Sequence, residues 1–290
     1  MNGFLPINKP AGPSSFDIVR QLKKQLPKIK IGHLGTLDPA AQGLLVCAIG
    51  DALKVLDLVN CEPKEYTFTI VFGSLTDTLD DKGTVVLTND HTPDKEALVG
   101  ILAQFTGRIQ QVPPVYSAIK IDGERAYARA RRNEEVTMVA RETTIFSLTC
   151  GSFDTVERCA QMRVSCSGGT YVRSLGRDIA AALGTCGHVK LICRQKIGIF
   201  ALDRAIDIYQ KDLSLTSHIV SIPNAAPDVA TVTIADADCL RIRQGQNIAA
   251  HTSWPNLPAL FACDTAGKMV AVLKRIDNNM VHPDRVFSCT

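Results

Sequence analysis

One aspartate, Asp38, is the strongest candidate for chemistry in this sequence. It lies in the stretch HLGTLDPAAQGLL (residues 33–45), between a glycine turn and a proline, just before an apolar run. An isolated Asp-Pro pair usually marks a structural turn. Here Gly32, Gly35 and Gly43 would let a ligand approach the backbone closely, and the flanking helix and strand would hold the loop rigidly. We therefore interpret Asp38 as a candidate nucleophile or general base.

Four further side chains could belong to the same site. His33 is explained equally well as a core or turn histidine and as a contact to a phosphate or a base. Tyr66 leads an aromatic strand, where core packing is the common role, but it could also offer a pocket a stacking face and a hydroxyl. Tyr171 and Arg173 follow a glycine turn that leads into a helix, which is either a tight connection or part of a site. An arginine there could pair with Asp38, since an opposite charge lowers the pKa of a carboxylate.

Several elements must position these side chains. A strand over residues 4–8 leads into a helix that begins with a capping-box-like pair, Ser14 and Asp17, and ends at Pro27. The stretch EYTFTIVF alternates, with one aromatic face, which predicts a strand. Helices and strands interleave without strict βαβ regularity, so an α+β domain around a mixed or antiparallel sheet fits best. We also expect helices over 51–59, from Thr92-Pro93 onward and from Arg173 to Gly184, and strands over 115–121 and 160–167.

The composition changes around SIPNAAPDVA (residues 221–230), which is rich in proline and uncharged except for Asp228. Short strand signals follow in TVTI, PALFAC and KMVAVLKRI. We place a boundary there, with a catalytic domain over 1–229 and a small, mostly β domain over 230–290. The proline-rich linker predicts few contacts between the two.

The charge balance does not by itself indicate a nucleic-acid-binding protein. The 290 residues include 32 basic and 29 acidic side chains, for a net charge of +3. Basic residues nevertheless gather in three stretches, each of which could be a solvated face. Near the candidate loops they favour a phosphate-backbone partner. The stretches are Arg20, Lys23, Lys24, Lys28 and Lys30; Arg125, Arg129, Arg131 and Arg132; and Lys190, Arg194 and Lys196.

Other features argue against a membrane or metalloprotein. The start, MNGFLPINKP, lacks the pattern of a signal peptide, and the longest apolar run, residues 44–49, is too short to span a bilayer. We therefore expect a soluble, cytoplasmic protein. The ten cysteines form no C-x-x-C pair, and Cys186, His188 and Cys193 lack a second close pair of ligands. Free thiols in a reducing cytosol are the better interpretation.

Several motifs together resemble the TruB family of tRNA pseudouridine synthases, which isomerise the T-loop uridine at tRNA position 55. They occur in the family's order with natural spacing, almost from end to end. The C-terminal segment, with RQGQ and PDRVF, is similar to a small PUA-type RNA-binding domain. The motifs are GFLPINKPAGPSS, GHLGTLDPAAQGLL, KEYTFTIVFGSLTDTLDDKG, FTGRIQQVPPVYSAIKIDGERAYARAR and SGGTYVRSLGRDI.

This resemblance implies a pseudouridine synthase fold of the α+β class: a mixed, largely antiparallel central sheet flanked by helices, plus the PUA-like domain. It implies that the partner is the T-arm of tRNA, that no cofactor, metal or protein partner is required, and that the protein is a monomer. It also assigns roles to residues. Asp38 matches the catalytic aspartate, Arg173 its partner, Tyr66 the tyrosine that stacks on the target base, His33 and Tyr171 substrate contacts, and Ile192 a residue of the uridine pocket.

The chain departs from the family pattern at a few positions. Leu34, Ala40 and Gln42 replace the usual Thr, Leu and Thr of the catalytic loop, and Cys193 replaces the first arginine of an LRR sequence. Ser167-Gly168 also stands for a usual Ser/Cys-Lys/Ser-Gly run. None of these changes touches the aspartate, the tyrosines or Arg173, so they bear on RNA contacts rather than on the chemistry.

The residue set suits the reaction that the resemblance implies. Pseudouridine formation breaks the N1–C1′ bond, turns the uracil and joins C5 to C1′, so one carboxylate is sufficient. The base must leave the stack, which explains an aromatic platform beside the aspartate. Two alternatives stay open. One is a non-catalytic RNA-binding or tRNA-folding chaperone of the same fold. The other is an aspartate-nucleophile hydrolase or phosphotransferase with a metal on Asp77, Asp80 and Asp81, which we interpret as loop residues.

Overall fold

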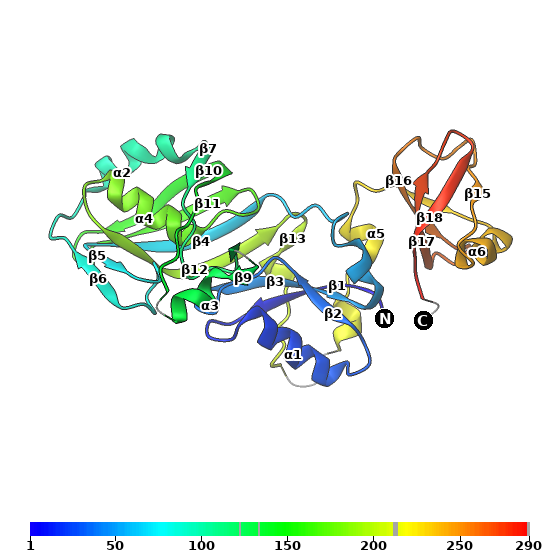
Figure 1. Ribbon diagram of the computed structural model, residues 1–290, viewed down its shortest axis with the longest axis horizontal. Helices are drawn as coiled ribbons and strands as arrows, with labels where there is room; N and C mark the ends of the chain where they lie inside the picture. The colour runs from blue at the N-terminus through cyan, green and yellow to red at the C-terminus, as the bar shows by residue number, and fades with distance from the viewer. Residues whose placement is uncertain (122, 133, 211–213, 289–290) are drawn as a thin grey trace.

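The computed structural model describes residues 1–121, 123–132, 134–210 and 214–288 (Figure 1). Within them, one large and one small sheet are accompanied by two short hairpins, six α-helices and four 3-10 helices. The large sheet contains β1 (Gly3–Lys9), β2 (Ile31–Leu34), β3 (Gln42–Ile49), β4 (Lys64–Phe72), β7 (Gly107–Gln111), β10 (Arg141–Asp154), β11 (Cys159–Cys166), β12 (Gly187–Ile197) and β13 (Phe200–Ala201). The small sheet contains β14 (Thr231–Thr233), β15 (Ile248–Ala249), β16 (Ala259–Cys263), β17 (Met269–Arg275) and β18 (Met280–Val286).

The remaining elements are short hairpins and helices. The hairpins pair β5 (Ser74–Thr76) with β6 (Val85–Thr88) and β8 (Lys120–Ile121) with β9 (Glu124–Arg125). The α-helices are α1 (Ser15–Gln25), α2 (Lys95–Ile101), α3 (Ala126–Arg131), α4 (Val172–Ala182), α5 (Ile222–Ala225) and α6 (Asp236–Arg243). The 3-10 helices are η1 (Gly50–Val55), η2 (Leu102–Phe105), η3 (Leu202–Arg204) and η4 (Leu215–His218).

The large sheet is mixed and largely antiparallel, which confirms the predicted architecture. Its strand order is β1-β3-β12-β4-β11-β10-β7, with β2 paired to β3 and β13 to β12. Among its described pairings, only that of β12 with β3 is parallel, and it joins Arg194 to Gly43. Gly43 has a φ of 99°, and a Cβ there would lie 2.4 Å from the carbonyl oxygen of Arg194. This glycine therefore serves close strand pairing, not the approach of a ligand that its position suggested.

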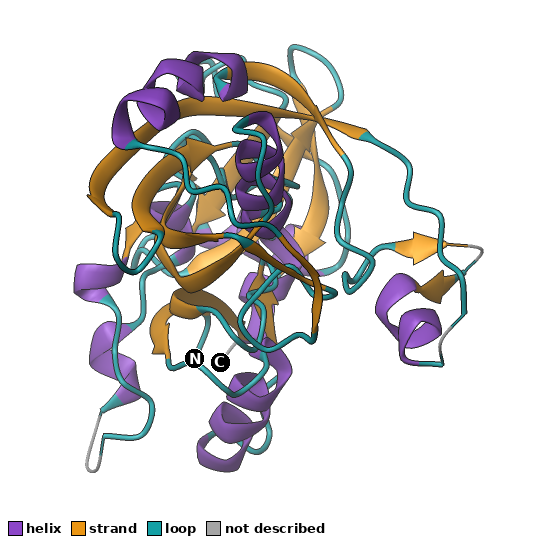
Figure 2. Cartoon of the chain, turned by 90° about the vertical axis from the view of Figure 1, so that its left-hand side faces the viewer, coloured by secondary structure: helices purple, strands orange, loops and turns teal. Residues whose placement is uncertain are grey.

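Helix α4 covers the face of the sheet that carries the aromatic side of β4. Phe68, Ile70 and Phe72 alternate along β4 and pack in one buried cluster with Leu175 and Ile179 of α4. Seen from the end of the molecule, the strands curve through the middle and the helices lie around them (Figure 2). The alternation of EYTFTIVF therefore predicted both the strand and its buried face.

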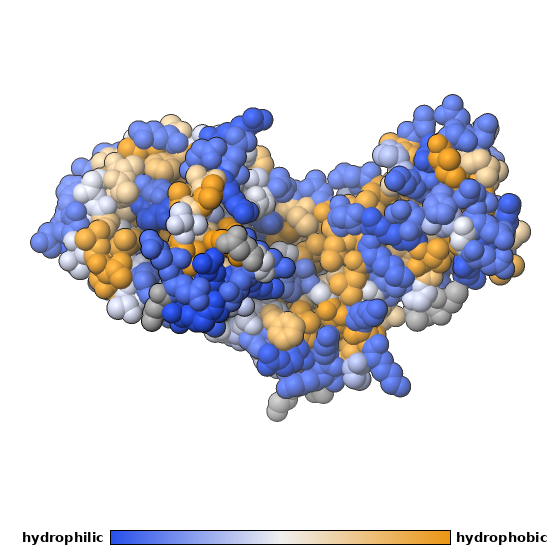
Figure 3. Space-filling model, in the orientation of Figure 1, coloured by the Kyte–Doolittle hydropathy of each residue, from blue (hydrophilic) through white to orange (hydrophobic). Residues whose placement is uncertain are grey.

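The small sheet packs against the large one through an apolar junction. Phe261, Val272 and Phe287 belong to the same buried cluster as Phe4 and Val46 of the large sheet. Hydrophobic side chains also lie along the hollowed region between the two parts of the molecule (Figure 3). The expectation of few contacts across the linker is therefore wrong, because the proline-rich segment conceals a junction made by residues far from it in sequence.

Ion pairs and hydrogen bonds reinforce this junction. The guanidinium of Arg285 lies 2.7 Å (Nη2 to Oδ2) from the carboxylate of Asp57. The backbone N–H of Ser288 donates to Asp51 at 2.6 Å, and the ammonium of Lys54 donates to the carbonyl oxygen of Val286 at 2.7 Å. The end of β18 and the segment after it thus contact η1 and the residue Asp57 that follows it.

Local signals succeeded best at the start of α1. There the Ser14 hydroxyl accepts from the backbone N–H of Asp17, and the Asp17 carboxylate accepts from the backbone N–H of Ser14, which is the predicted capping box. Two other helices differ from expectation. Residues 50–55 form the 3-10 helix η1 in place of a helix over 51–59, and α2 begins after Asp94, whose carboxylate accepts from the N–H of Ala97.

The predicted strand over 115–121 is wrong except at its end, where Lys120 and Ile121 form β8. Pro113 and Pro114 cannot donate to a sheet, and the N–H of Ser117 bonds to the nearby carbonyl of Val115. The segment is therefore a compact loop. Within this loop, the carbonyl oxygen of Tyr116 accepts a hydrogen bond from Arg173.

Two general expectations can be compared with the described residues. No helix in them is long and apolar enough to cross a membrane. Nine cysteines are free thiols there, and the tenth, Cys289, lies outside the described residues.

Candidate active site

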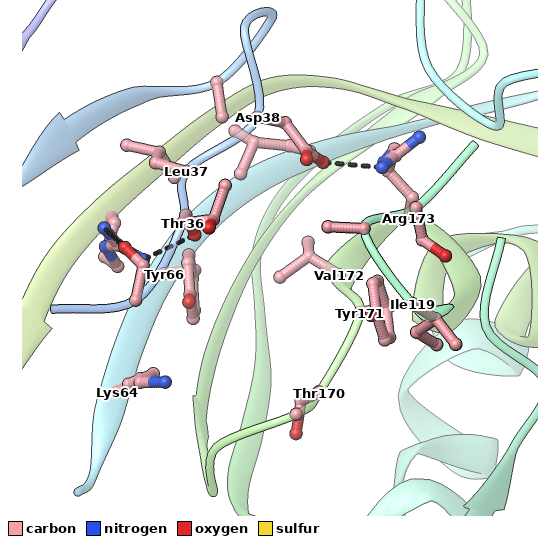
Figure 4. A pocket seen from close by; sticks show the side chains of 17 residues that line it. Thr36, Leu37, Asp38, Lys64, Tyr66, Ile119, Thr170, Tyr171, Val172 and Arg173 are labelled. Carbon is pink, nitrogen blue, oxygen red and sulfur yellow. Dashed lines mark hydrogen bonds and ion pairs between the residues drawn. The ribbon is translucent and has the colours of Figure 1, made fainter. Parts of the chain in front are cut away.

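A pocket of about 310 Å³ lies where the Asp38 loop, β4, β12 and the start of α4 meet (Figure 4). Most of the predicted site residues line it, although they come from four separate parts of the chain. They are Asp38, Tyr66, Tyr171, Arg173 and Ile192. His33 is not among the lining residues.

Arg173 pairs with Asp38 across the pocket. Its Nη2 lies 2.7 Å from Oδ2 of Asp38, as the residue pattern suggested. The arginine side chain is only 5% exposed, while that of Asp38 is 41% exposed. The guanidinium also donates to the carbonyl oxygens of Thr78 and Tyr116, each at 2.9 Å. A buried, fully oriented cation therefore aims a solvent-accessible carboxylate into the pocket.

Asp80 is a site residue that the sequence analysis did not identify. Its Oδ2 lies 3.6 Å from Nη1 of Arg173, and its side chain is 10% exposed. Its Oδ1 accepts from the Thr78 hydroxyl at 2.7 Å and from the N–H of Lys82 at 3.1 Å. Asp80 thus contacts one terminal nitrogen of Arg173 while Asp38 contacts the other. The only available signal was its place in TDTLDDKG, which we interpreted as a loop or a weak metal motif.

Residues at the end of β1, the start of α1 and the turn between them hold the backbone of the Asp38 loop. The hydroxyl of Ser15 bonds to both the N–H and the carbonyl of Leu37 at 2.9 Å. The carbonyl of Pro39 accepts from the N–H of Gly12 at 2.8 Å and from the ammonium of Lys9 at 3.3 Å. Lys9 is fully buried, and burial lowers its pKa to about 8 against the opposing effect of Asp38.

Arg194 holds the same loop from the other side. Its guanidinium donates to the carbonyls of Gly35, Thr36 and Leu44 at 3.1, 3.2 and 2.8 Å. With only 1% of its surface exposed, it cannot belong to a basic surface patch, so that part of the sequence analysis is wrong. Together with Ser15, Lys9 and Gly12, Arg194 leaves the loop around Asp38 little freedom to move. The rigid loop that the sequence predicted around Asp38 is therefore held by contacts from both sides.

The walls of the pocket are aromatic and aliphatic. Tyr66 is 8% and Ile192 is 6% exposed, and both line the pocket. Burial raises the pKa of Tyr66, and the nearby Arg194 opposes this shift. Tyr171 precedes α4, and its N–H donates to the side-chain oxygen of Gln111 at 2.8 Å. The side chains of both tyrosines point into the same space in Figure 4.

Ile192 reaches the pocket because β12 is irregular beside it. The pairing of β12 with β4 shifts between Lys190 and Cys193, and Leu191 has a φ of 56°, in the left-handed region. A β-bulge of this kind redirects the side chains on either side of it. No feature of the sequence KLICR announces the irregularity.

His33 lies on β2, beside the loop, and is half-buried. Its Nδ1 is buried and has no hydrogen-bond partner among the described residues. Burial lowers the pKa of this imidazole, and the positive charge of Arg194 lowers it further. These properties favour a neutral ring. A substrate contact by His33 stays a prediction.

The acidic residues of the TDTLDDKG segment have separate structural roles. Asp77 accepts from the N–H of Thr84 at 2.8 Å, Asp80 supports Arg173, and Asp81 pairs with Lys82 at the surface. Within the described part of the chain, no three His, Cys, Asp or Glu side chains gather as a metal site would require. This arrangement gives the metal-dependent hydrolase interpretation no support.

The second basic stretch is partly neutralised. Arg132 pairs with Glu124 and Glu134, each at 2.6 Å, and Arg129 also contacts Glu134. Arg125 and Arg131 flank the ring of Tyr127 at 6.0 and 5.4 Å, which is a cation–π geometry. These side chains therefore present both positive charge and an aromatic ring at the surface.

Comparison with solved structures defines the class of fold. The chain is similar to one in the crystal structure of a Cbf5-Nop10-Gar1 complex, with a TM-score of 0.70, 22% identity, and coverage of 99% of this chain and 85% of that one. A chain in the structure of an H/ACA RNP bound to a substrate RNA containing 2′-deoxyuridine gives a TM-score of 0.68 at 20% identity. That chain is covered over 85% of its length and this one over 99%. The fold is a pseudouridine synthase fold, as predicted.

Sequence comparison defines the family. Residues 22–172 match the N-terminal domain of the TruB family pseudouridylate synthases. The chain is 37% identical to tRNA pseudouridine synthase B of Rhodospirillum rubrum, with 99% of this chain and 97% of that protein covered. It is 38% identical to tRNA pseudouridine synthase B of Rickettsia bellii, with both chains covered completely. The chain belongs to the TruB family of pseudouridylate synthases.

Proposed function

We propose that this protein isomerises the uridine at position 55, in the T-loop of tRNA, to pseudouridine, with Asp38 as the catalytic carboxylate. The observation that carries the proposal is the Asp38–Arg173 pair, which orients an accessible carboxylate in a pocket walled by Tyr66, Tyr171 and Ile192. Relatives of 37% and 38% identity that extend over almost the whole chain are named tRNA pseudouridine synthase B, which supports the choice of substrate.

We infer the following roles for the site residues in the reaction. The target nucleotide leaves the base stack, and its uracil stacks on Tyr66. The N1–C1′ bond breaks with its electron pair going to the base, and Asp38 either attacks the sugar or stabilises the positive charge at C1′. The uracil then turns and C5 bonds to C1′, which displaces the Asp38 carboxylate in the route where it has attacked the sugar. The proton on C5 then leaves and N1 takes up a proton. Arg173 holds the Asp38 carboxylate in a fixed direction toward the pocket, and the fixed loop backbone reduces the need for reorganisation during the reaction.

Other parts of the chain complete the proposal. His33 contacts the RNA beside the uridine pocket. The catalytic domain extends over residues 1–229, and residues 230–290 form a PUA-like domain that binds the RNA at a distance from the site. The protein acts in the cytoplasm as a monomer on the T-arm, without a protein partner. The solvent-exposed arginines around Tyr127 support an electrostatic contact with phosphates.

The test is to incubate the purified protein with an unmodified tRNA transcript and map pseudouridine at single-nucleotide resolution. Asp38→Asn, which keeps the shape but removes the charge, should abolish turnover while tRNA binding changes little. Asp81→Asn is the matched control and should retain activity, because within the described residues Asp81 pairs only with the exposed Lys82. Retention of even a few per cent of turnover by Asp38→Asn would remove Asp38 from the mechanism. Binding and refolding of tRNA without pseudouridine formation by the wild-type protein would favour the chaperone alternative.

A further inference from the structure

Lys64, the first residue of β4, lines the pocket but has no role in the mechanism described so far. It lies two residues before Tyr66 on the same strand, so the two side chains project from the same face of the sheet. In Figure 4, Asp38 and Lys64 lie toward opposite ends of the pocket, and the ring of Tyr66 lies between them.

The Lys64 ammonium lies between two loops and has no partner among the described residues. A Cβ at either Gly35 or Gly168 would lie 3.6 Å from Nζ, which places the ammonium between the Asp38 loop and the turn before α4. Across the residues that the structure describes, no hydrogen bond or ion pair reaches this ammonium. The nearby carboxylate, Glu62, instead accepts from the N–H of Gly168 at 2.7 Å.

The electrostatic surroundings of Lys64 are unfavourable in the empty pocket. Burial lowers its pKa, and the neighbouring positive charge of Arg194 lowers it further, whereas Glu62 and the thiols of Cys61 and Cys166 act in the opposite direction. A half-buried cation without a partner costs free energy of folding. Such an arrangement is expected where a bound ligand supplies the missing hydrogen-bond acceptor.

The position within the pocket identifies which part of the substrate supplies that acceptor. When Asp38 meets C1′ and the base stacks on Tyr66, the sugar and its phosphates lie at the Asp38 end. The group that extends toward the opposite end is the uracil ring, whose accessible acceptors are its carbonyl oxygens. Arg194 also lines this region, but its Nε, Nη1 and Nη2 donate to the carbonyls of the loop and β3. The Lys64 ammonium retains all three of its N–H donors.

We propose that Lys64 is a catalytic residue whose ammonium donates to a carbonyl oxygen of the flipped uracil and stabilises negative charge on the ring. This inference rests on the proposed function. As the N1–C1′ bond breaks, its electron pair moves into the uracil and reaches the carbonyl oxygens, where Lys64 offsets the charge. Formation of the C5–C1′ bond returns the electrons, C5 loses its proton and N1 gains one. Lys64 keeps its own proton throughout.

The direct test is Lys64→Met, which keeps the length of the side chain and removes the charge. With the tRNA saturated by enzyme, the single-turnover rate should fall about 10²-fold, the typical effect of losing a donor to developing charge. The dissociation constant, measured by filter binding, and its salt dependence should change little. Lys82→Met is the control, because Lys82 is a surface lysine that contacts Asp81 at 3.2 Å and is not among the residues that line the pocket. The control should react at the wild-type rate.

A second measurement protects the test against misfolding and against a phosphate role. Thermal unfolding of Lys64→Met should occur at or above the wild-type temperature, since an unpartnered cation has been removed. A transcript with 2-thiouridine or 4-thiouridine at the target position offers a sulfur, which is a weaker acceptor. One of these two substitutions should slow the wild-type enzyme but leave Lys64→Met unaffected.

The outcomes separate this inference from the proposed function. Pseudouridine formation by Lys64→Met within threefold of the wild-type rate would overturn the inference alone. Weaker binding with a shallower salt dependence and an unchanged single-turnover rate would also overturn it, in favour of a phosphate contact. If each thiouridine slows the wild-type enzyme and Lys64→Met equally, the inference would also be overturned. Absence of pseudouridine with the wild-type protein would overturn both proposals.

Discussion

Replacing Arg173 by Met should destabilise the protein and stop the reaction for two separable reasons. Arg173 is buried between Asp38 and Asp80 and also satisfies two backbone carbonyls. Asp38, with 41% of its side chain exposed, can regain water when the cation is lost. The side chain of Asp80 is only 10% exposed, so its carboxylate cannot regain water in the same way. Breaking a buried ion pair costs about 3–5 kcal/mol. Most of that cost should come from Asp80, and it should lower the unfolding temperature by roughly 10 °C.

A double variant separates stability from catalysis. In Arg173→Met/Asp80→Asn the uncompensated buried charge is gone, so about 1–3 kcal/mol of the lost stability should return. Activity should not return, because Asp38 still lacks the cation that aims it. The assays are thermal unfolding by circular dichroism and single-turnover pseudouridine formation on a tRNA transcript. Arg177→Met is the control, since Arg177 lies on the same helix, pairs with its neighbour Asp178 and is 25% exposed.

Two results would refute this reasoning. If Arg173→Met unfolds at the same temperature as Arg177→Met, then the pairing with Asp80 does not contribute to the stability of the fold. If the double variant recovers the wild-type rate, then Arg173 serves only to neutralise Asp80, and Asp38 needs no cationic partner.

Three further predictions follow from the same structure. Tyr66→Phe should keep tRNA binding, since base stacking contributes about 1–3 kcal/mol, but should react about 10²-fold more slowly if the hydroxyl passes on the proton that leaves C5. Tyr66→Leu should lower both the affinity and the rate. Wild-type behaviour of the Phe variant in single-turnover and filter-binding assays would make Tyr66 a platform only. Lys9 has an ordinary pKa of 10.5 and a folded pKa of about 8, so the unfolded chain binds more protons between these values. The free energy of unfolding should therefore rise with pH across that window, by up to about 3 kcal/mol from this group, and denaturant titrations of Lys9→Met should lack that contribution. Removal of residues 230–290 should weaken RNA binding, flatten its salt dependence and, by uncovering the apolar junction around Phe287, lower the unfolding temperature. Unchanged RNA affinity would mean that the removed domain does not touch the substrate.

The parts of this protein that sequence predicts well are those whose causes are local. The capping box at Ser14 and Asp17 involves residues three apart, and the buried face of β4 follows from alternation within one strand. Asp38 was identifiable for a similar reason, because glycine and proline around a carboxylate are visible in a single short motif. The pairing of Arg173 with Asp38 required a match between two distant motifs, which only a known pattern of residues supplied.

The parts that sequence did not predict depend on contacts between distant segments. Arg194 bonds to the carbonyl of Leu44, 150 residues earlier, and its neighbours in the sequence made it look like part of a charged surface. The role of Asp80 was missed for the same reason, because its partner, Arg173, lies on α4. The failed strand over 115–121 shows a related error, since the stretch by itself suggested a strand, whereas the preceding prolines and the contact with Arg173 hold its backbone in a loop.

The fastening of the small sheet to the large one also bears on how a substrate is selected. Arg285 is paired with Asp57, Ser288 with Asp51, and Phe287 lies in a shared apolar cluster, so these contacts hold the small sheet against the large one. If one RNA touches both, as proposed, the separation between the two contact points is set by the protein. The fixed separation then selects the length of the stem. An RNA with the correct loop but a stem one base pair longer would not reach both contact points at once.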